Sequence, residues 1–204
     1  IGESLLEVVG NIDNINSEYS EYYQTVSELK KEKEKIEMIQ LLDLLIEGQK
    51  LLKTEIVKDD VCPLCEQDKN RNELILELNK RIKDLEELRK EKEGVEQKSK
   101  DLQHKIQVNL NTLNSLKSEK LLKTKDFEVE SKHIGNLINS LDKYSSELKK
   151  NFITENEIGK SDELEIKKTN YKVIANSSKN KTKDLLEAQK KNPKLQIHTK
   201  LSLE

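Results

Sequence analysis

The chain has 204 residues, of which 37% are charged, 33% hydrophobic and 3% aromatic, and it has no tryptophan. So few large apolar side chains argue against a compact globular core, because little area is available to bury per residue. The formal net charge of −2 gives no overall basic character that would point to nucleic acid or an anionic membrane. No apolar run approaches the roughly 18 residues of a membrane span and no signal peptide opens the chain, so we expect no membrane contact.

Residues 1–36 place apolar side chains alternately three and four positions apart, which is typical of a coiled coil. The seam positions are Leu5, Val8, Ile12, Ile15, Tyr19, Tyr22, Val26, Leu29, Lys33 and Ile36. All but Lys33 are apolar, so we predict an ascending coiled-coil arm over residues 1–56. The two seam tyrosines are expected to place their hydroxyls at the seam edge, in reach of water.

Between Met38 and Ile46 the apolar residues become too frequent for a two-stranded seam. One explanation is a stutter in the heptads, with extra packing against the partner helix. The other is a second apolar face that forms a small apical globule or a dimer contact.

The only two cysteines, Cys62 and Cys65, form a Cys-Pro-Leu-Cys motif between the long helical segments. We predict that they lie in an apex loop over residues 57–70. A Cys-x-x-Cys pair can hold one zinc ion through two thiolates, whereas zinc prefers four ligands in a tetrahedron. The alternatives are an intrachain disulfide or redox-active pair, or a pair with no function. No βαβ pattern typical of an oxidoreductase surrounds the motif, and a reduced pair without a disulfide framework suits the cytoplasm.

The histidines do not easily complete such a zinc site. His104 lies 39 residues beyond Cys65, roughly 58 Å along a straight helix. His133 and His198 are further away in sequence. Two more sulfurs must therefore come from a second copy of the chain, which predicts a four-cysteine site on an isologous twofold axis.

The return segment after the motif is also expected to be helical. Asn70 or Asn72 is a suitable N-terminal cap. One heptad frame then runs through residues 85–151 and predicts a descending coiled-coil arm over residues 71–151. Its later seam positions are Leu113, Leu116, Lys120, Lys123, Phe127, Glu130, Ile134, Leu137, Leu141, Tyr144, Leu148 and Asn151. Polar seam residues such as Asn109 are expected to fix the register of the two arms.

Charge supports an antiparallel pairing of the two arms. Pairing outward from the apex would place Ile1 near residue 127. Residues 1–29 contain six acids and no Lys or Arg, whereas residues 100–127 contain six Lys and three acids. The two segments are therefore complementary partners.

The last quarter of the chain loses this seam over residues 151–161. We predict an additional helical segment over residues 152–192, which either folds back or pairs with a segment preceding Ile1. Residues 193–204 alternate in polarity and predict a short strand of an adjoining domain. Residues 167–194 carry nine Lys and two acids, which form either a phosphate-contacting face or an ordinary solvated face.

The motif at the tip of an antiparallel coiled coil resembles the zinc hook of the structural-maintenance-of-chromosomes-like ABC ATPases. That group includes the double-strand-break repair ATPase and several bacterial anti-phage ATPases. The run QKLLKTEIVKDDVCPLCEQ, followed by NELILELNKRIKDLEEL, is more similar to the bacterial members. The resemblance implies that Cys62 and Cys65 share one zinc ion with the same residues of a second molecule. The chain has no G-x-x-x-x-G-K-[S/T] loop or signature motif, so the ATP-hydrolysing head is not in this polypeptide.

The sequence thus predicts an all-α protein, a long antiparallel coiled-coil hairpin with a zinc-hook apex. The first functional hypothesis is a zinc-mediated homodimerisation segment of a larger DNA-acting ATPase, in DNA repair or antiviral defence. A nuclease or effector subunit is expected on the parent protein, and DNA contact is expected through its heads. The alternative is a binding module that docks a protein or nucleic acid through the apolar patch or the basic third helix. No catalytic residues are identifiable, and the start at Ile1 rather than Met suggests a segment of a longer protein.

Overall fold

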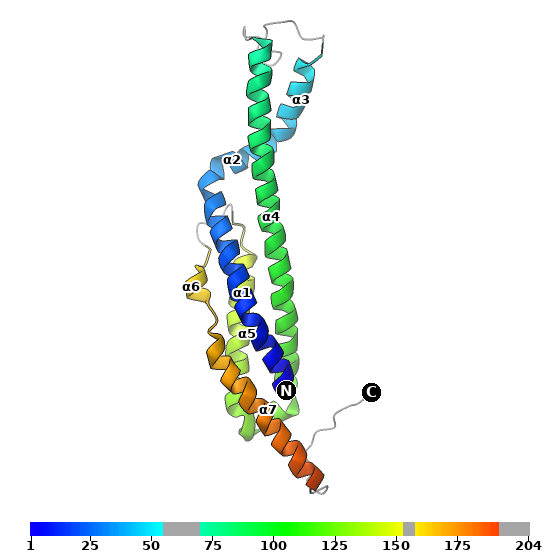
Figure 1. The fold of residues 1–204 in the computed structure, drawn as a ribbon, viewed down its shortest axis with the longest axis vertical. Coiled ribbons are helices and arrows are strands. Elements are labelled where there is room, and N and C mark those ends of the chain that lie inside the picture. The colour runs from blue at the N-terminus through cyan, green and yellow to red at the C-terminus, as the bar shows by residue number, and fades with distance from the viewer. Residues whose placement is uncertain (55–69, 153–157, 192–204) are drawn as a thin grey trace. The chain divides into compact units, whose positions relative to one another are not determined.

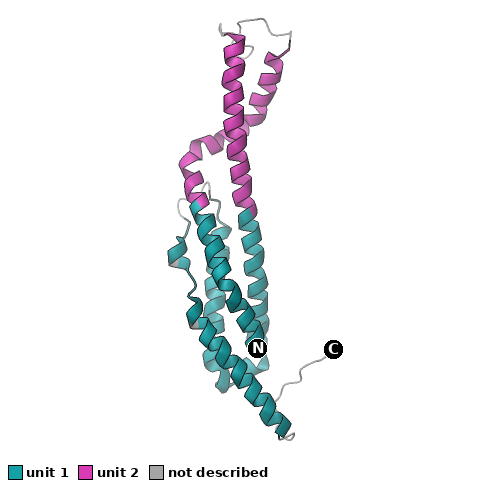
Figure 2. Ribbon diagram, in the orientation of Figure 1, with its two compact units in different colours: residues 1–24, 98–204 teal, residues 25–97 magenta. Residues whose placement is uncertain are grey.

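The computed structural model describes residues 1–54, 70–152 and 158–191 (Figure 1). These residues form helices and turns and contain no strand, which confirms the all-α class. None of the described helices is both long enough and apolar enough to cross a membrane. The chain divides into unit 1, residues 1–24 and 98–204, and unit 2, residues 25–97 (Figure 2).

Seven α-helices are present in the described residues. They are α1 (Gly2–Leu29), α2 (Lys33–Met38), α3 (Leu42–Leu52), α4 (Arg71–Ser118), α5 (Glu128–Leu148), α6 (Ser161–Leu164) and α7 (Lys168–Lys191). Short 3₁₀ turns lie between some of them, at Lys30–Glu32, Ile39–Leu41, Lys120–Lys123 and Lys125–Phe127. The predicted first arm is therefore interrupted twice, around the point where the regular heptad pattern gives way to the denser apolar run.

Helices α1 and α4 run antiparallel within unit 1, as the charge pattern predicts. Glu18 accepts from Lys105 at 2.6 Å, and Glu21 accepts from Lys98 at 2.7 Å. The α1 seam positions from Leu5 to Leu29 are all buried. The acidic first helix thus contacts lysines of α4, while its apolar stripe packs inward.

The register of this pair is set partly by a polar contact. Asn109 is 5% exposed, and its Oδ1 accepts from Nδ2 of Asn11 at 3.1 Å. Its own Nδ2 donates to the carbonyl of Lys105 at 2.7 Å. A shift of α1 along α4 would leave this buried amide without its partner in α1, so the contact favours the observed register, which is the role expected of Asn109. Counted back along the antiparallel pair from the contact of Asn11 with Asn109, Ile1 falls level with about residue 119, at the end of α4.

The prediction that residues 71–151 form one continuous descending arm is wrong. Helix α4 ends at Ser118, two 3₁₀ turns follow, and α5 runs back along α4. Ser99 Oγ, on α4, donates to the carbonyl of Leu148 at the end of α5, at 2.9 Å. The physical reason lies at Lys120 and Lys123, two consecutive seam positions of the heptad frame that carry charge and offer no apolar side chain to continue the stripe.

The heptad frame nevertheless identifies the buried residues of α5. They include Ile134, Leu137, Leu141, Tyr144 and Leu148, all of which lie in the predicted seam. The apolar spacing is preserved on both sides of the turn, so it does not show whether the chain continues or reverses.

The additional helical segment expected over residues 152–192 contains α6 and α7. Helix α7 contacts α5, with Ala175 and Ser178 fully buried. It also approaches α1 so closely that a Cβ on Gly2 would lie 2.4 Å from Cα of Lys179. A larger residue at position 2 would therefore push the two backbones apart. The strand predicted over residues 193–204 lies outside the described residues.

Candidate functional site

The predicted metal ligands, Cys62 and Cys65, lie outside the described residues, as do His198 and almost all of the apex loop over residues 57–70. The structure describes the two chain segments that flank the motif. Among the described residues, no group of three or more His, Cys, Asp or Glu side chains could hold a metal ion. The candidate metal centre is therefore built from its flanks, α3 and the start of α4.

Arg71 ties the end of α3 to the start of α4. Its Nε donates to the carbonyl of Leu52 at 2.6 Å, and its Nη2 donates to the carbonyl of Thr54 at 2.7 Å. Carbonyls at the C-terminus of a helix lack intrahelical partners, and a cation is favourable there. The guanidinium thus brings together the two ends of the segment that carries both cysteines.

The start of α4 is capped by Asn70, one of the two predicted caps. Its Oδ1 accepts from the backbone N–H of Asn72 at 3.0 Å and from that of Glu73 at 3.2 Å. These bonds satisfy two of the donors that a helix N-terminus leaves free. Both flanks of the cysteine segment are therefore fixed by side-chain-to-backbone hydrogen bonds.

Replacing Arg71 by Met is expected to destabilise the last turn of α3 by about 1–2 kcal/mol, because two hydrogen bonds from a charged donor are lost. Amide hydrogen exchange over residues 49–53 should then accelerate by about tenfold. Arg81→Met, on an exposed position of the same helix, is the matched control and should leave this exchange unchanged. Equal exchange in the two variants would show that Arg71 does not hold the flanks together.

The dense apolar run near the apex divides between two surfaces. Leu42 packs with Ile82 and Leu85 in a small core of unit 2, and the partly buried residues against it are Met38, Leu45, Ile46 and Leu78. By contrast, Leu41, Leu44 and Leu51 are 44%, 60% and 50% exposed. We call these three residues the α3 leucine face. The dense run therefore provides extra packing against α4 and also a second apolar face that no other described residue covers.

The two described histidines lie apart from any catalytic constellation in the described residues. His104 is exposed on α4. His133 is half-buried on α5, and its ring meets that of Tyr171 edge to face, with the centroids 6.2 Å apart. This contact gives His133 a packing role between α5 and α7.

Several lysines of the basic segment are paired with acids of unit 1. Lys168 contacts Asp13 at 2.5 Å, and Lys179 contacts Glu3 at 3.6 Å. These pairs join α7 to α1, so these lysine charges are engaged within the chain. The structure therefore favours a packing role for this part of α7 over a phosphate-contacting face.

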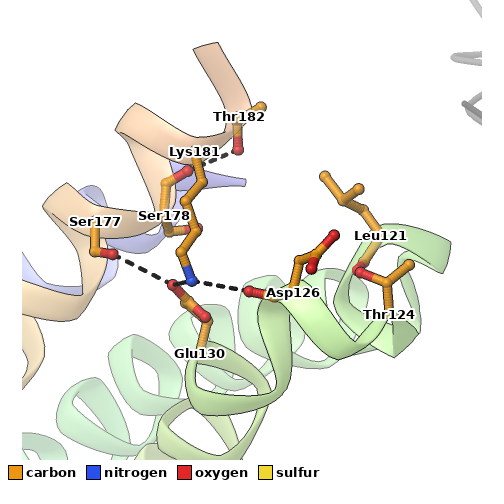
Figure 3. Close-up of polar contacts among 8 residues, drawn as sticks. All are labelled: Leu121, Thr124, Asp126, Glu130, Ser177, Ser178, Lys181 and Thr182. Atoms are coloured by element: carbon orange, nitrogen blue, oxygen red, sulfur yellow. Dashed lines mark hydrogen bonds and ion pairs between the residues drawn. The ribbon is translucent and has the colours of Figure 1, made fainter. Parts of the chain in front are cut away.

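A third lysine of α7 contacts a buried carboxylate (Figure 3). Glu130 is 1% exposed, and its Oε1 lies 2.7 Å from Nζ of Lys181. The same amine donates to the carbonyl of Asp126 at 2.8 Å, and Ser177 Oγ lies 3.4 Å from Oε1 of Glu130. Oε2 of Glu130 and Oγ of Ser178 are buried without a hydrogen-bond partner among the described residues. Lys181 is therefore the counter-ion of an almost fully buried charge.

A cluster of three tyrosines forms the centre of unit 1. Tyr19, Tyr22 and Tyr144 are 0–1% exposed, so the expectation that the seam hydroxyls reach water is wrong. Tyr19 donates to the carbonyl of Gly159 at 2.8 Å, and its ring meets Tyr144 edge to face with centroids 4.6 Å apart. The reason is that α5 and the segment after it cover the seam.

Asn16 connects this cluster to the chain between α6 and α7. Its Oδ1 accepts from the hydroxyl of Tyr144 at 2.8 Å and from the backbone N–H of Ile166 at 3.1 Å. Its Nδ2 donates to the carbonyl of Ile166 at 2.9 Å. One side chain of α1 thus holds both a tyrosine hydroxyl and a non-helical backbone segment.

The tyrosine cluster predicts alkaline sensitivity. Burial raises the pKa of Tyr19, Tyr22 and Tyr144 above the ordinary value near 10. The folded state therefore keeps these protons where the unfolded chain loses them, and stability declines as the pH rises past about 10. Each such group contributes at most about 1.4 kcal/mol per pH unit to the decline. Tyr144→Phe should show a shallower fall of melting temperature between about pH 9.5 and 11 than wild type. Equal slopes in the two proteins would contradict this assignment.

The chain matches no protein-family model, no curated protein and no solved structure.

Proposed function

We propose that this chain is the zinc-mediated dimerisation segment of a larger DNA-acting ATPase. In this proposal Cys62 and Cys65 of two chains hold one zinc ion, at the apex of a coiled-coil hairpin. The observation that carries the proposal is the pair of hydrogen bonds from Arg71, at the start of α4, to the carbonyls of Leu52 and Thr54, at the end of α3. These bonds join the two ends of the segment that contains both cysteines. The antiparallel pairing of α1 with α4 gives further support, because it is the arrangement that a hairpin requires.

The donor chemistry fits zinc with half of its ligands supplied by each chain. Two thiolates three positions apart in a Cys-x-x-Cys motif suit a tetrahedral zinc site, but fill only two of its four ligand positions. When bound, the ion would cross-link two chains and hold their apices together. The chain's own part is to present both sulfurs from one short segment with fixed ends.

Joining two apices would serve as a tether. It converts separate, weak contacts of two DNA-binding heads into one multivalent contact, because the second head acts at a raised effective concentration. The resemblance of the hook region suggests a parent ABC-type ATPase in DNA repair or anti-phage defence, with a nuclease or effector subunit. Reduced thiolates would place this assembly in the cytoplasm.

The direct test is the mass of the protein in solution as zinc is removed. Light scattering should give a dimer with zinc and a monomer after a chelator, and added zinc should restore the dimer. The variant Cys62→Ser/Cys65→Ser should remain a monomer with zinc present. Circular dichroism should show unchanged helix content in that variant, which separates loss of the tether from loss of the fold. A variant that keeps the dimer mass would refute the tether.

A binding module is the second candidate, and the α3 leucine face is the observation that favours it. Three half-exposed leucines on a short helix and the turn before it form an apolar surface that a partner could cover. A protein with this function would keep its mass on chelation and in the cysteine variant. The basic helix α7 supports docking less well, because lysines on it already contact Asp13, Glu3 and Glu130.

A further inference from the structure

We propose that the α3 leucine face of one chain packs against the same face of the second chain once zinc has joined the two apices. This inference rests on the proposed tether and adds a second contact to it. It assigns the apolar surface that the described residues of unit 2 leave uncovered to a self-complementary interface between two copies.

The three leucines lie on one side of α3 and the turn before it. Positions 41, 44 and 51 are separated by three and seven residues, a spacing that places side chains above one another on a helix. Gly48 falls on the same side, and a Cβ added there would meet nothing within 4 Å. Leu42, which is 1% exposed, points instead into the core with α4. The described part of the chain therefore leaves this side of the helix open.

The size of the face indicates which occupant fits. Three leucines that are each about half exposed can contribute only a few hundred Å², whereas a stable interface buries about 800 Å² on each partner. A free partner protein would be held too weakly by this face alone. A second copy that zinc already holds nearby acts at an effective concentration in the millimolar range, where a contact of this size forms.

Position in the chain and charge agree with a second copy as the occupant. Leu51 is the last residue of the face and precedes Cys62 by eleven positions, so the face adjoins the cysteine segment in sequence. Contacts across a twofold axis bring identical residues near one another, and uncompensated like charges would oppose them. Glu47, beside the face, is compensated within its own chain by Lys50 at 2.6 Å. This pair leaves no net charge at Glu47, the acid nearest to the face on α3.

The contact can be tested by placing the photo-crosslinker p-benzoylphenylalanine at Leu44 in the zinc-loaded chain. Irradiation should give a covalent dimer, and mixed light and heavy isotope-labelled chains should map the linkage to α3 of the other molecule. The linkage should vanish with chelator and in the Cys62→Ser/Cys65→Ser background. The same crosslinker at Asp43, an exposed position outside the face, is the control and should give at least fivefold less dimer.

A second measurement does not depend on crosslinking. Leu44→Gln/Leu51→Gln alters exposed side chains only, so helix content should stay unchanged while the dissociation constant of the zinc-loaded dimer rises by about tenfold or more. A zinc-dependent dimer with neither the crosslink nor the weaker affinity would overturn this interface and leave the tether intact. Absence of any zinc-dependent dimer would overturn both. A crosslink between chains that persists without zinc would overturn the dependence of this contact on the metal, and a crosslink that maps within one chain would show that the chain itself covers the face.

Discussion

Replacing Tyr19 by Ala is expected to lower the free energy of unfolding by about 3–5 kcal/mol, the range for removing a large buried ring. The side chain is fully buried, with its ring against Tyr144 and its hydroxyl bonded to the carbonyl of Gly159. Its removal would open a cavity between α1 and α5 and leave a carbonyl without its donor. Urea denaturation followed by circular dichroism at neutral pH measures the change.

Two variants separate the contributions of Tyr19. Tyr19→Phe keeps the ring and loses only the hydrogen bond to Gly159, so we expect a loss of about 1–2 kcal/mol. Tyr23→Ala removes a half-buried ring from the same helix and should cost about 1 kcal/mol or less. A loss no larger for Tyr19→Ala than for Tyr23→Ala would show that the tyrosine cluster is not the centre of unit 1.

Replacing Lys181 by Met is expected to destabilise the protein by about 2–4 kcal/mol. The cause is Glu130, whose side chain is 2% exposed and would lose the counter-ion that lies 2.7 Å away. The side chain of Lys181 is itself 41% exposed, so the loss of its own packing contributes less to the destabilisation than the unpaired charge of Glu130 does. Its amine also lies 5.4 Å from the ring centroid of Phe127, a weaker contact.

A double-mutant cycle measures the coupling of this pair. Glu130→Met/Lys181→Met should recover most of the stability that Lys181→Met loses, because no buried charge is left unpaired. Lys183→Met, at an exposed position of the same helix, should change stability by no more than about 0.5 kcal/mol. If Lys181→Met matches Lys183→Met, the buried carboxylate does not depend on Lys181.

Much of the packing could be predicted from apolar spacing, whereas the course of the chain could not. The seam residues of α1 and α4 are buried as predicted, because a helix that packs on one side must repeat its apolar residues at that spacing. The reversal after Ser118 leaves this spacing unchanged. Its one sequence signal is the charged pair of seam positions, Lys120 and Lys123.

Contacts between distant segments escaped prediction for a different reason. Glu130 occupies a seam position, where a charged side chain would be unfavourable in a two-stranded coiled coil. In the structure, Lys181 of α7 forms an ion pair with it. The seam tyrosines were expected near water because two helices would leave their hydroxyls at an edge. A further layer of chain buries them, and sequence spacing alone does not reveal that layer.

The candidate site shows the same division. Asn70 could be predicted as a cap, because its acceptor serves backbone donors two and three residues later. The hydrogen bonds from Arg71 go to backbone carbonyls on the other side of the cysteine segment, and no sequence pattern predicts such a contact. The excess of leucines near the apex is visible in the sequence, but which of them face solvent depends on the rotation of α3 against α4.

The stoichiometry and ligand set of bound zinc test the central claim most directly. Metal analysis combined with X-ray absorption on the purified protein should find one zinc ion per two chains, with four sulfur ligands at about 2.3 Å. One zinc per chain with nitrogen or oxygen ligands in a monomer, or no bound zinc at all, would contradict a metal shared between two apices.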